Sequence, residues 1–365
     1  MIELKNDEFY KVFELFSDLR DCTPVYSILN NNSASRIFVD DKEKPSSAFM
    51  WNEFRYSYIA GNSENEKFNE KLALLLKNEL LPVGKESNDP TMVFYPDNES
   101  WLLKTDEILQ GKLPLAINRQ LFKFNKEYFR KLKISFDESI QIKRMDKKIL
   151  NDLDDAILDD IHMSWISLER FLEKGVGFIL LKDYELISSC YSCFADDHSF
   201  ETSIKTYNEK FRRKGYATAV TVKYIEYCLE NGIEPKWECW EGNESSVRLA
   251  EKLGFEKTTL YPVKFILLNE ADELMENAFY YLFDLKKYEE SAEFFEKAFE
   301  LMEDVEAENL YFCSCSFALA ENPIKTVEYL KKAIQNGFND FDRIKNEEAF
   351  KIIGNSLDLD NILRI

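Results

Sequence analysis

Residues Lys210 to Leu229 read KFRRKGYATAVTVKYIEYCL, and this stretch decides how the middle of the chain is interpreted. Three consecutive cations precede a lone Gly215 and a long apolar-periodic run. The run predicts a helix that begins near Tyr216, and a helix N-terminus exposes unpaired N–H groups at the positive end of a dipole. Glycine also lets a ligand approach the backbone closely. The stretch is therefore either a solvated basic turn or a phosphate site.

The segments around this turn alternate between strand and helix patterns. Two strands, VGFILLKD and YELISSCYSCFADD, follow a helical stretch that ends at Gly175, and FETSIKTY is a third strand before the turn. After the predicted helix come a strand, EPKWECW, a short helix, NESSVRLAEKLG, and a closing strand region, FEKTTLYPVKFILL. This order predicts an α/β (α+β) core with at least one crossover connection over residues 135–268.

The turn and two signals downstream resemble the GNAT superfamily of N-acetyltransferases. The acyl-CoA motif of that family is Gln or Arg, two residues, Gly, one residue, then Gly or Ala, and RRKGYA from Arg212 to Ala217 fits it. An Asn at the head of the next helix and a Gly-Phe pair eleven residues later fit as Asn243 and Gly254–Phe255. The segment looks most like the zwittermicin A resistance branch. The resemblance implies a GNAT fold for residues 135–268.

The same resemblance implies an acetyl-CoA site and no metal. Backbone N–H groups from Arg213 to Thr218 would hold the CoA pyrophosphate, and the end of the strand FETSIKT would offer main-chain groups to the pantetheine arm. The residues implied as cofactor-binding are Ile204, Lys205, Thr206, Arg212, Arg213, Lys214, Gly215, Tyr216, Ala217, Thr218 and Asn243.

The catalytic groups are less clearly marked. Attack by an amine needs a base, and the candidates are Glu238 on the strand KWECW and Glu201 at the head of the central strand. Either residue could instead be an ordinary surface carboxylate. Many GNAT enzymes carry a Tyr as general acid four residues before the Gly of Gly-Phe, but Ala250 occupies that position here. Tyr261, Tyr216 or water are the alternatives for the acid.

Residues 1–125 show the order α, β, β, α, β, α. SRIFVD and SSAFMW predict a hairpin, the helix EKFNEKLALLLKNELLP is expected to stop at Pro82, and TMVFYP predicts another strand. The rhythm resembles half of a GNAT domain, but no RxxGxA follows. We therefore expect a degenerate GNAT-like domain that does not bind CoA and that shapes the acceptor pocket.

Residues 270–365 lack strand signals and contain a weak internal repeat. A shift of 35 residues aligns Ala298 with Ala333 and Phe295 with Leu330. Such a period predicts helical hairpins resembling tetratricopeptide repeats. A helical tail of this kind could bind a protein partner.

Composition excludes several other functions. With 47 basic and 67 acidic residues the net charge is −20, which argues against a nucleic-acid binder. No apolar run approaches the length of a membrane span, and the N-terminus lacks a signal-peptide pattern. Seven scattered cysteines indicate reduced thiols and a cytoplasmic location, and only two histidines are available for a His-based triad or metal site.

Together these observations predict an acyltransferase of the EC 2.3.1 type. It would transfer acetyl from acetyl-CoA to a primary amine of a small molecule by direct attack, and resistance-type chemistry is implied only by resemblance. The alternative is a non-catalytic GNAT-like sensor that binds CoA and recruits a protein through its tail. The missing Tyr at position 250 and the repeats support this alternative.

Overall fold

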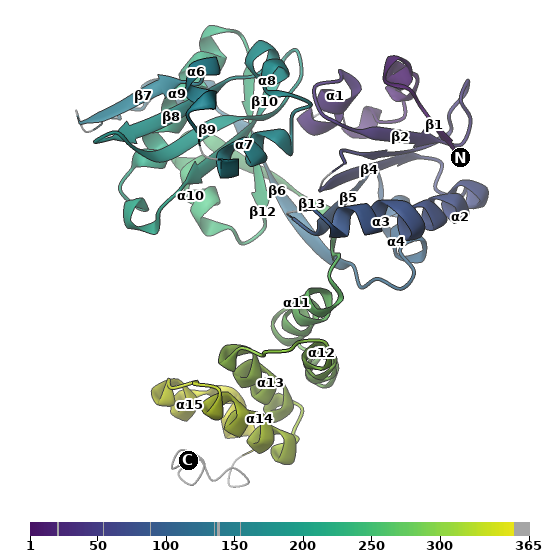
Figure 1. Cartoon of the computed structure of the whole chain (residues 1–365), viewed down its shortest axis with the longest axis vertical. Coiled ribbons are helices and arrows are strands. Elements are labelled where there is room, and N and C mark those ends of the chain that lie inside the picture. Colours follow the sequence, from purple (N-terminus) through teal and green to yellow (C-terminus); the bar gives the residue numbers. More distant parts are fainter. Residues whose placement is uncertain are drawn as a thin grey trace. The chain divides into compact units, whose positions relative to one another are not determined.

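The computed structural model of the chain describes residues 1–19, 22–53, 55–87, 89–134, 136, 139–153 and 155–353. These residues form two compact units (Figure 1). The first contains residues 1–110 and 116–265, and the second contains residues 111–115 and the described residues from 266 onward. The first unit therefore spans both regions that were predicted to be α/β.

The larger sheet of the first unit has eight strands in the order β1-β2-β3-β4-β5-β13-β6-β12. The predicted hairpin is confirmed, because β2 and β3 pair antiparallel with Arg36 opposite Trp51, while β5 runs parallel to β4. The strands are β1 (Ile2–Glu3), β2 (Arg36–Val39), β3 (Ser47–Trp51), β4 (Tyr56–Gly61), β5 (Thr91–Pro96), β6 (Leu115–Phe124), β12 (Glu238–Trp240) and β13 (Phe255–Leu267). β13 lies between β5 and β6, so a strand from late in the chain completes a sheet that begins at the N-terminus.

The helices of this half are short, and one continues further than predicted. They are the 3₁₀ helix Asn6–Val12, a 3₁₀ turn (Ser17–Leu19), α1 (Thr23–Leu29), α2 (Glu66–Leu75), a π-helical turn (Leu76–Leu80), α3 (Leu81–Lys85), α4 (Glu99–Ile108) and α5 (Lys126–Lys131). The expected stop at Pro82 is wrong, because the backbone stays helical to Lys85. Pro82 lies in the first turn of α3, where its missing N–H is not needed, and the π turn before it relieves the ring.

The smaller sheet has five strands in the order β11-β10-β9-β8-β7. Its strands are β7 (Ile140–Arg144), β8 (Gly177–Lys182), β9 (Glu185–Ala195), β10 (Ser199–Thr206) and β11 (Glu234–Lys236). The helical stretch before Gly175 is divided into α6 (Lys147–Asn151), α7 (Asp155–His162) and α8 (Leu168–Lys174). After β10 come a 3₁₀ turn (Glu209–Phe211), α9 (Tyr216–Glu230) and α10 (Glu244–Lys252), so the predicted strand–turn–helix order around RRKGYA is confirmed.

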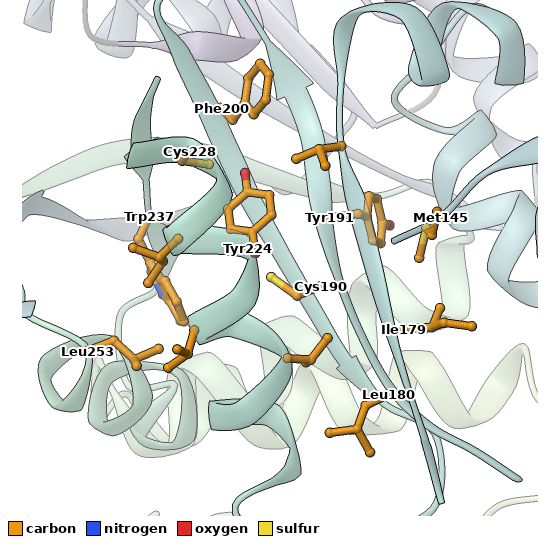
Figure 2. Close-up of a cluster of buried hydrophobic side chains, with 14 of the residues drawn as sticks. Met145, Ile179, Leu180, Cys190, Tyr191, Phe200, Tyr224, Cys228, Trp237 and Leu253 are labelled. Atoms are coloured by element: carbon orange, nitrogen blue, oxygen red, sulfur yellow. The ribbon is translucent and has the colours of Figure 1, made fainter. Parts of the chain in front are cut away.

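The apolar face of α9 packs on the five-stranded sheet and forms the core beneath the turn. Tyr224 and Cys228 on α9, Cys190 on β9 and Leu180 on β8 have no exposed surface. Figure 2 shows the ring of Tyr224 beside the sheet, with its hydroxyl end directed toward Phe200. The packing of α9 on the sheet fixes the axis of the helix relative to β10.

All seven cysteines fall within the described residues, and none is paired with another.

The prediction of one strand over EPKWECW is wrong. Glu234–Lys236 pairs parallel with β10, but Glu238–Trp240 leaves that sheet and pairs antiparallel with β6. The change of sheet occurs at Trp237, whose ring is buried against Phe255 at 5.1 Å and whose carbonyl accepts the N–H of Phe122. Trp237 is thus the residue at which the chain passes from one sheet to the other.

The second unit is built from helical hairpins. Its helices are α11 (Glu270–Phe283), α12 (Tyr288–Glu300), α13 (Ala307–Leu319), α14 (Pro323–Gln335), α15 (Phe341–Asn346) and α16 (Glu348–Ile352). α12 and α14 have the same length and lie 35 residues apart, as the internal repeat predicts, and Phe295 and Leu330 are both fully buried. Among the described residues, no helix is long and apolar enough to cross a membrane.

Candidate active site

The N-terminus of α9 is open and carries no side-chain cap. Gly215 occupies the N-cap position with φ of 85°, and Arg213 two residues earlier also has a positive φ of 61°. The first N–H to bond within the helix is that of Ala219, which donates to the carbonyl of Gly215. Backbone turns of this kind leave several N–H groups pointing into one concavity, where an anion fits.

A side chain at Gly215 would occupy the open space in front of this turn. A Cβ built there would meet no protein atom within 4 Å. The corresponding helix of the N-terminal half, α2, also follows a strand and precedes one parallel to it, but the side chain of Asn65 caps it at Phe68 N–H. The start of α9 therefore lacks the side-chain cap that α2 has, and this leaves its N–H groups available to an anion.

Cations from other elements reach the same helix start. Nζ of Lys252 on α10 donates to Oγ1 of Thr218 at 3.3 Å, and Nζ of Lys182 on β8 donates to the hydroxyl of Tyr216 at 3.2 Å. The predicted Arg213 and Lys214 are exposed beside them, whereas Arg212 is paired with Glu209. Lys252 was missed because no local pattern indicates which helix a lysine will face.

The strand β10 loses its neighbour on one side halfway along its length. Its pairing with β11 covers only Ser199, Phe200 and Glu201, whereas its pairing with β9 continues to Thr206. Directly after the last paired residue, the hydroxyl of Thr202 donates to the carbonyl of Lys236 at 2.7 Å. The residues expected to face the pantetheine arm, Ile204, Lys205 and Thr206, lie beyond this point. Main-chain groups on that edge are thus placed where an extended ligand could pair with them.

Glu201 is a buried carboxyl at the point where β10 and β11 separate. It is 7% exposed, and one of its oxygens accepts the N–H of Glu238 at 3.1 Å. Burial raises the pKa of Glu201 to about 8, and the negative charge of Glu238 adds to the shift, while Arg119 opposes it. A carboxyl with such a pKa holds its proton at neutral pH and becomes able to accept one as the pH rises through about 8.

The Glu238 carboxylate is engaged in a buried ion pair. Its Oε1 accepts two N–H groups of Arg119, at 3.1 and 2.8 Å, and the hydroxyl of Tyr95 at 2.9 Å. The guanidinium of Arg119 also lies 4.2 Å from the centre of the Trp240 ring. The sequence indicated Glu238 as a candidate base but not its partners Arg119 and Tyr95, which lie in the N-terminal half of the first unit.

Two further predicted residues, Tyr261 and Asn243, have partners within the protein. The hydroxyl of Tyr261 on β13 donates to the carbonyl of Pro96, its ring stacks on Tyr95, and burial raises its pKa. Asn243 lies at the N-cap of α10 as expected, and its side-chain oxygen accepts the N–H of Ser246. These contacts give Tyr261 and Asn243 structural roles that do not depend on a ligand.

Ala250, where many family members carry the acid, is completely buried in α10. We expect Ala250→Tyr to destabilise the protein by about 1–3 kcal/mol, because the added ring must displace packed side chains. The melting temperature should fall by about 5 °C. Glu251→Tyr, at the exposed neighbouring position, should leave it nearly unchanged. A stable Ala250→Tyr protein would show that the core has room for the missing ring.

The chain is similar to known proteins in sequence and in fold. Residues 14–263 match the sequence model of the family described as GNAT acetyltransferase. The chain is 30% identical over 264 residues to an uncharacterised N-acetyltransferase, YdfB, of Bacillus subtilis, covering 72% of this chain and 97% of the relative.

Solved structures show the same fold. A GCN5-related N-acetyltransferase-like protein from Streptococcus suis superposes with a TM-score of 0.56 at 24% identity, covering 71% of this chain and 98% of the other. A tandem GNAT protein from the clavulanic acid biosynthesis pathway gives 0.50 at 8% identity, covering 73% and 98%. At these identities the structures indicate fold alone. The match to the family model ends at residue 263, before the first helix of the second unit, α11.

Proposed function

The chain belongs to the GNAT acetyltransferase family, and from this premise we propose that it transfers acetyl from acetyl-CoA to a primary amine of a small molecule. The observation that carries the proposal is the buried Glu201 at the point where β10 loses β11. The fold and the class of activity, N-acetyltransferase, belong to the family as a whole. The acceptor and the residue roles are the proposed part.

The donor set at the start of α9 fits a pyrophosphate. Backbone N–H groups from Arg213 to Thr218, with Lys252 and Lys214 beside them, would hold its charge, and Gly215 leaves the concavity free. Ile204 to Thr206 would bind the pantetheine arm through the main chain. Asn243, whose side chain caps α10, would contribute by positioning that helix.

Acetyl-CoA, when bound, supplies the thioester: a C–N bond to the amine forms, the C–S bond breaks and CoA leaves as the thiolate. Glu201 takes the proton that the amine nitrogen loses. Because its pKa is about 8, Glu201 becomes available as a base when the pH rises through that value. Glu238 is less suited, since its Oε1 already accepts three hydrogen bonds. With Ala250 in place of the usual Tyr, we assign protonation of the thiolate to water, and Glu201 then returns its proton to the solvent before the next turnover.

The helical unit would be a tetratricopeptide-like surface for a protein partner. Its repeated helices α12 and α14 border a cavity of about 550 Å³ lined by Phe299, Leu310 and Tyr329, with Glu303 and Asp304 at its edge. We further propose that the chain acts in the cytoplasm and is nearest to the zwittermicin A resistance branch, so that its acceptor is a cationic, antibiotic-like amine. The net charge of −20 is compatible with such an acceptor.

Two measurements test this function. Calorimetry with CoA should show binding below 1 mM, expected at about 1–100 μM for a substrate-like ligand. Acetyl-CoA turnover should then be followed with a panel of polyamines, amino acids and aminoglycosides by release of the CoA thiol. Binding with no turnover across the panel would favour the CoA-binding sensor, which the absence of a Tyr at Ala250 supports. Absence of CoA binding would exclude both the acetyltransferase and the CoA-binding sensor.

A further inference from the structure

Glu238 connects the candidate base to a distant part of the chain. It is the first residue of β12, directly after the chain has left the five-stranded sheet. Its N–H donates to Glu201 on β10, and its carboxylate pairs with Arg119, which lies 119 residues earlier on β6. One residue thus links a side chain of the smaller sheet to a side chain of the larger sheet.

Arg119 is held in one orientation by three contacts. Two of its N–H groups donate to the same oxygen of Glu238, and its guanidinium lies against the ring of Trp240 on the same short strand. Arg119 is 7% exposed, so water cannot readily replace these partners. β12 has only three residues, and its ladder with β6 places Trp240 opposite Arg119 itself. The ion pair therefore reinforces a strand that has few hydrogen bonds of its own.

We propose that Arg119 is a positioning residue for acetyl transfer: by pairing with Glu238 it holds β12 in register on β6 and thereby keeps the Glu238 N–H against the carboxyl of Glu201. The inference rests on the proposed role of Glu201 as base. It extends that role by giving the N-terminal half a part in the reaction other than shaping the acceptor pocket. Arg119 acts through Glu238 and does not touch the reacting atoms.

The arrangement has an electrostatic consequence that can be measured. The titratable and charged groups that face Glu201 come from five places: Glu238 on β12, Arg119 on β6, Lys236 on β11, Cys193 on β9 and Cys22 before α1. Burial raises the pKa of both thiols, so they are uncharged at neutral pH. Arg119 and Lys236 lower the pKa of Glu201, and Glu238 raises it. Loss of Arg119 and loss of Glu238 must therefore have opposite effects.

The test is a carboxyl titration of the full-length, ligand-free protein by infrared or ¹³C NMR spectroscopy, with the Glu201 signal assigned by Glu201→Gln. We expect Arg119→Met to raise the midpoint by about one pH unit or more and Glu238→Gln to lower it by a similar amount. Arg119→Lys, which keeps the charge, should stay near the wild type. Equal midpoints in wild type and Arg119→Met, or shifts of the same sign in Arg119→Met and Glu238→Gln, would overturn the proposal.

Control variants separate this role from simple destabilisation. Arg170→Met removes another partly buried arginine, which pairs with Glu173 and Asn32, and should leave the Glu201 midpoint unchanged. If Arg119→Met does not fold, Arg119→Gln, which also removes the charge, takes its place, and a Glu201 midpoint equal to that of the wild type would overturn the proposal. In turnover, Arg119→Met should lower kcat while the KM for acetyl-CoA stays within about twofold, because Arg119 lies on β6, whereas the residues proposed to bind the cofactor lie on β10, around the start of α9 and on α10.

The proposal and the proposed function can fail separately. Full activity in Glu201→Gln would reject Glu201 as the base, and with it the positioning role, whatever the titrations show. Suppose instead that Glu201→Gln is inactive, but that the Glu201 midpoint is the same in the wild type, Arg119→Met and Glu238→Gln. The proposed function would then stand, and only the role of Arg119 would be rejected.

Discussion

Glu201→Gln should lower kcat by about 10²–10⁴-fold, the usual range for loss of a general base. Glutamine has the same shape and can still accept the Glu238 N–H, so the structure around the separated strands should persist. The rate of the wild type should rise with pH through about 8, where Glu201 loses its proton. The measurement is steady-state release of CoA thiol, with an amine identified from the panel, across pH 6–10. Since the acceptor amine ionises in both proteins, the difference between the two profiles isolates Glu201.

Thermal unfolding provides an independent control for this variant. The pKa of Glu201 is raised from its ordinary value of 4.5 to about 8 in the folded state, so between these values the folded protein holds a proton that the unfolded chain has released. Stability attributable to this group therefore falls as pH rises across that window. Glu201→Gln should lack this loss. The stability of this variant relative to the wild type should therefore be greater at pH 8 than at pH 5. Unchanged turnover, or a large loss of CoA affinity in Glu201→Gln, would contradict the assignment of Glu201 as the base.

The parts of the site that the sequence predicted are those made by neighbouring residues. The turn RRKGYA, the start of α9 and the cap at Asn243 depend on contacts within a few positions, which spacing encodes. Gly254 was also predicted from its spacing, although part of the reason for the glycine comes from a distant segment. Its φ is 90°, and a Cβ would come within 2.9 Å of Tyr128 and 3.2 Å of the carbonyl of Asn125, so only glycine fits where β13 begins.

The parts that could not be predicted depend on pairing between distant segments. Periodicity showed that EPKWECW is extended, but it carries no information about which strand lies beside it, so the change of sheet at Trp237 was missed. The partners of Glu238 were missed for the same reason, because Arg119 and Tyr95 are more than 100 residues away in the chain. The domain limits proposed from sequence, 1–125, 135–268 and 270–365, remain a proposal about independent units. Structurally, β12 and β13 complete the sheet that begins at the N-terminus.

Gly215→Ala should weaken CoA binding by at least about a hundredfold, which corresponds to about 2.7 kcal/mol. Two effects contribute. A Cβ at Gly215 would project into the open space in front of the turn and keep a phosphate away from its N–H groups. The positive φ of 85° would also strain an alanine by roughly 1–2 kcal/mol, so the turn would relax away from the geometry that aligns those groups. Calorimetry with CoA measures the loss directly.

Gly232→Ala is the matched control, because it lies just after the other end of the same helix. Its φ is 71°, and a Cβ there would also meet no protein atom within 4 Å. The two variants should therefore lose similar stability, about 1–2 kcal/mol each, by the same left-handed strain. Only Gly215→Ala should lose CoA, since the C-terminal end of α9 presents carbonyl groups and repels anions. Equal CoA affinity in the two variants would place the pyrophosphate elsewhere and remove the structural basis for the proposed cofactor site.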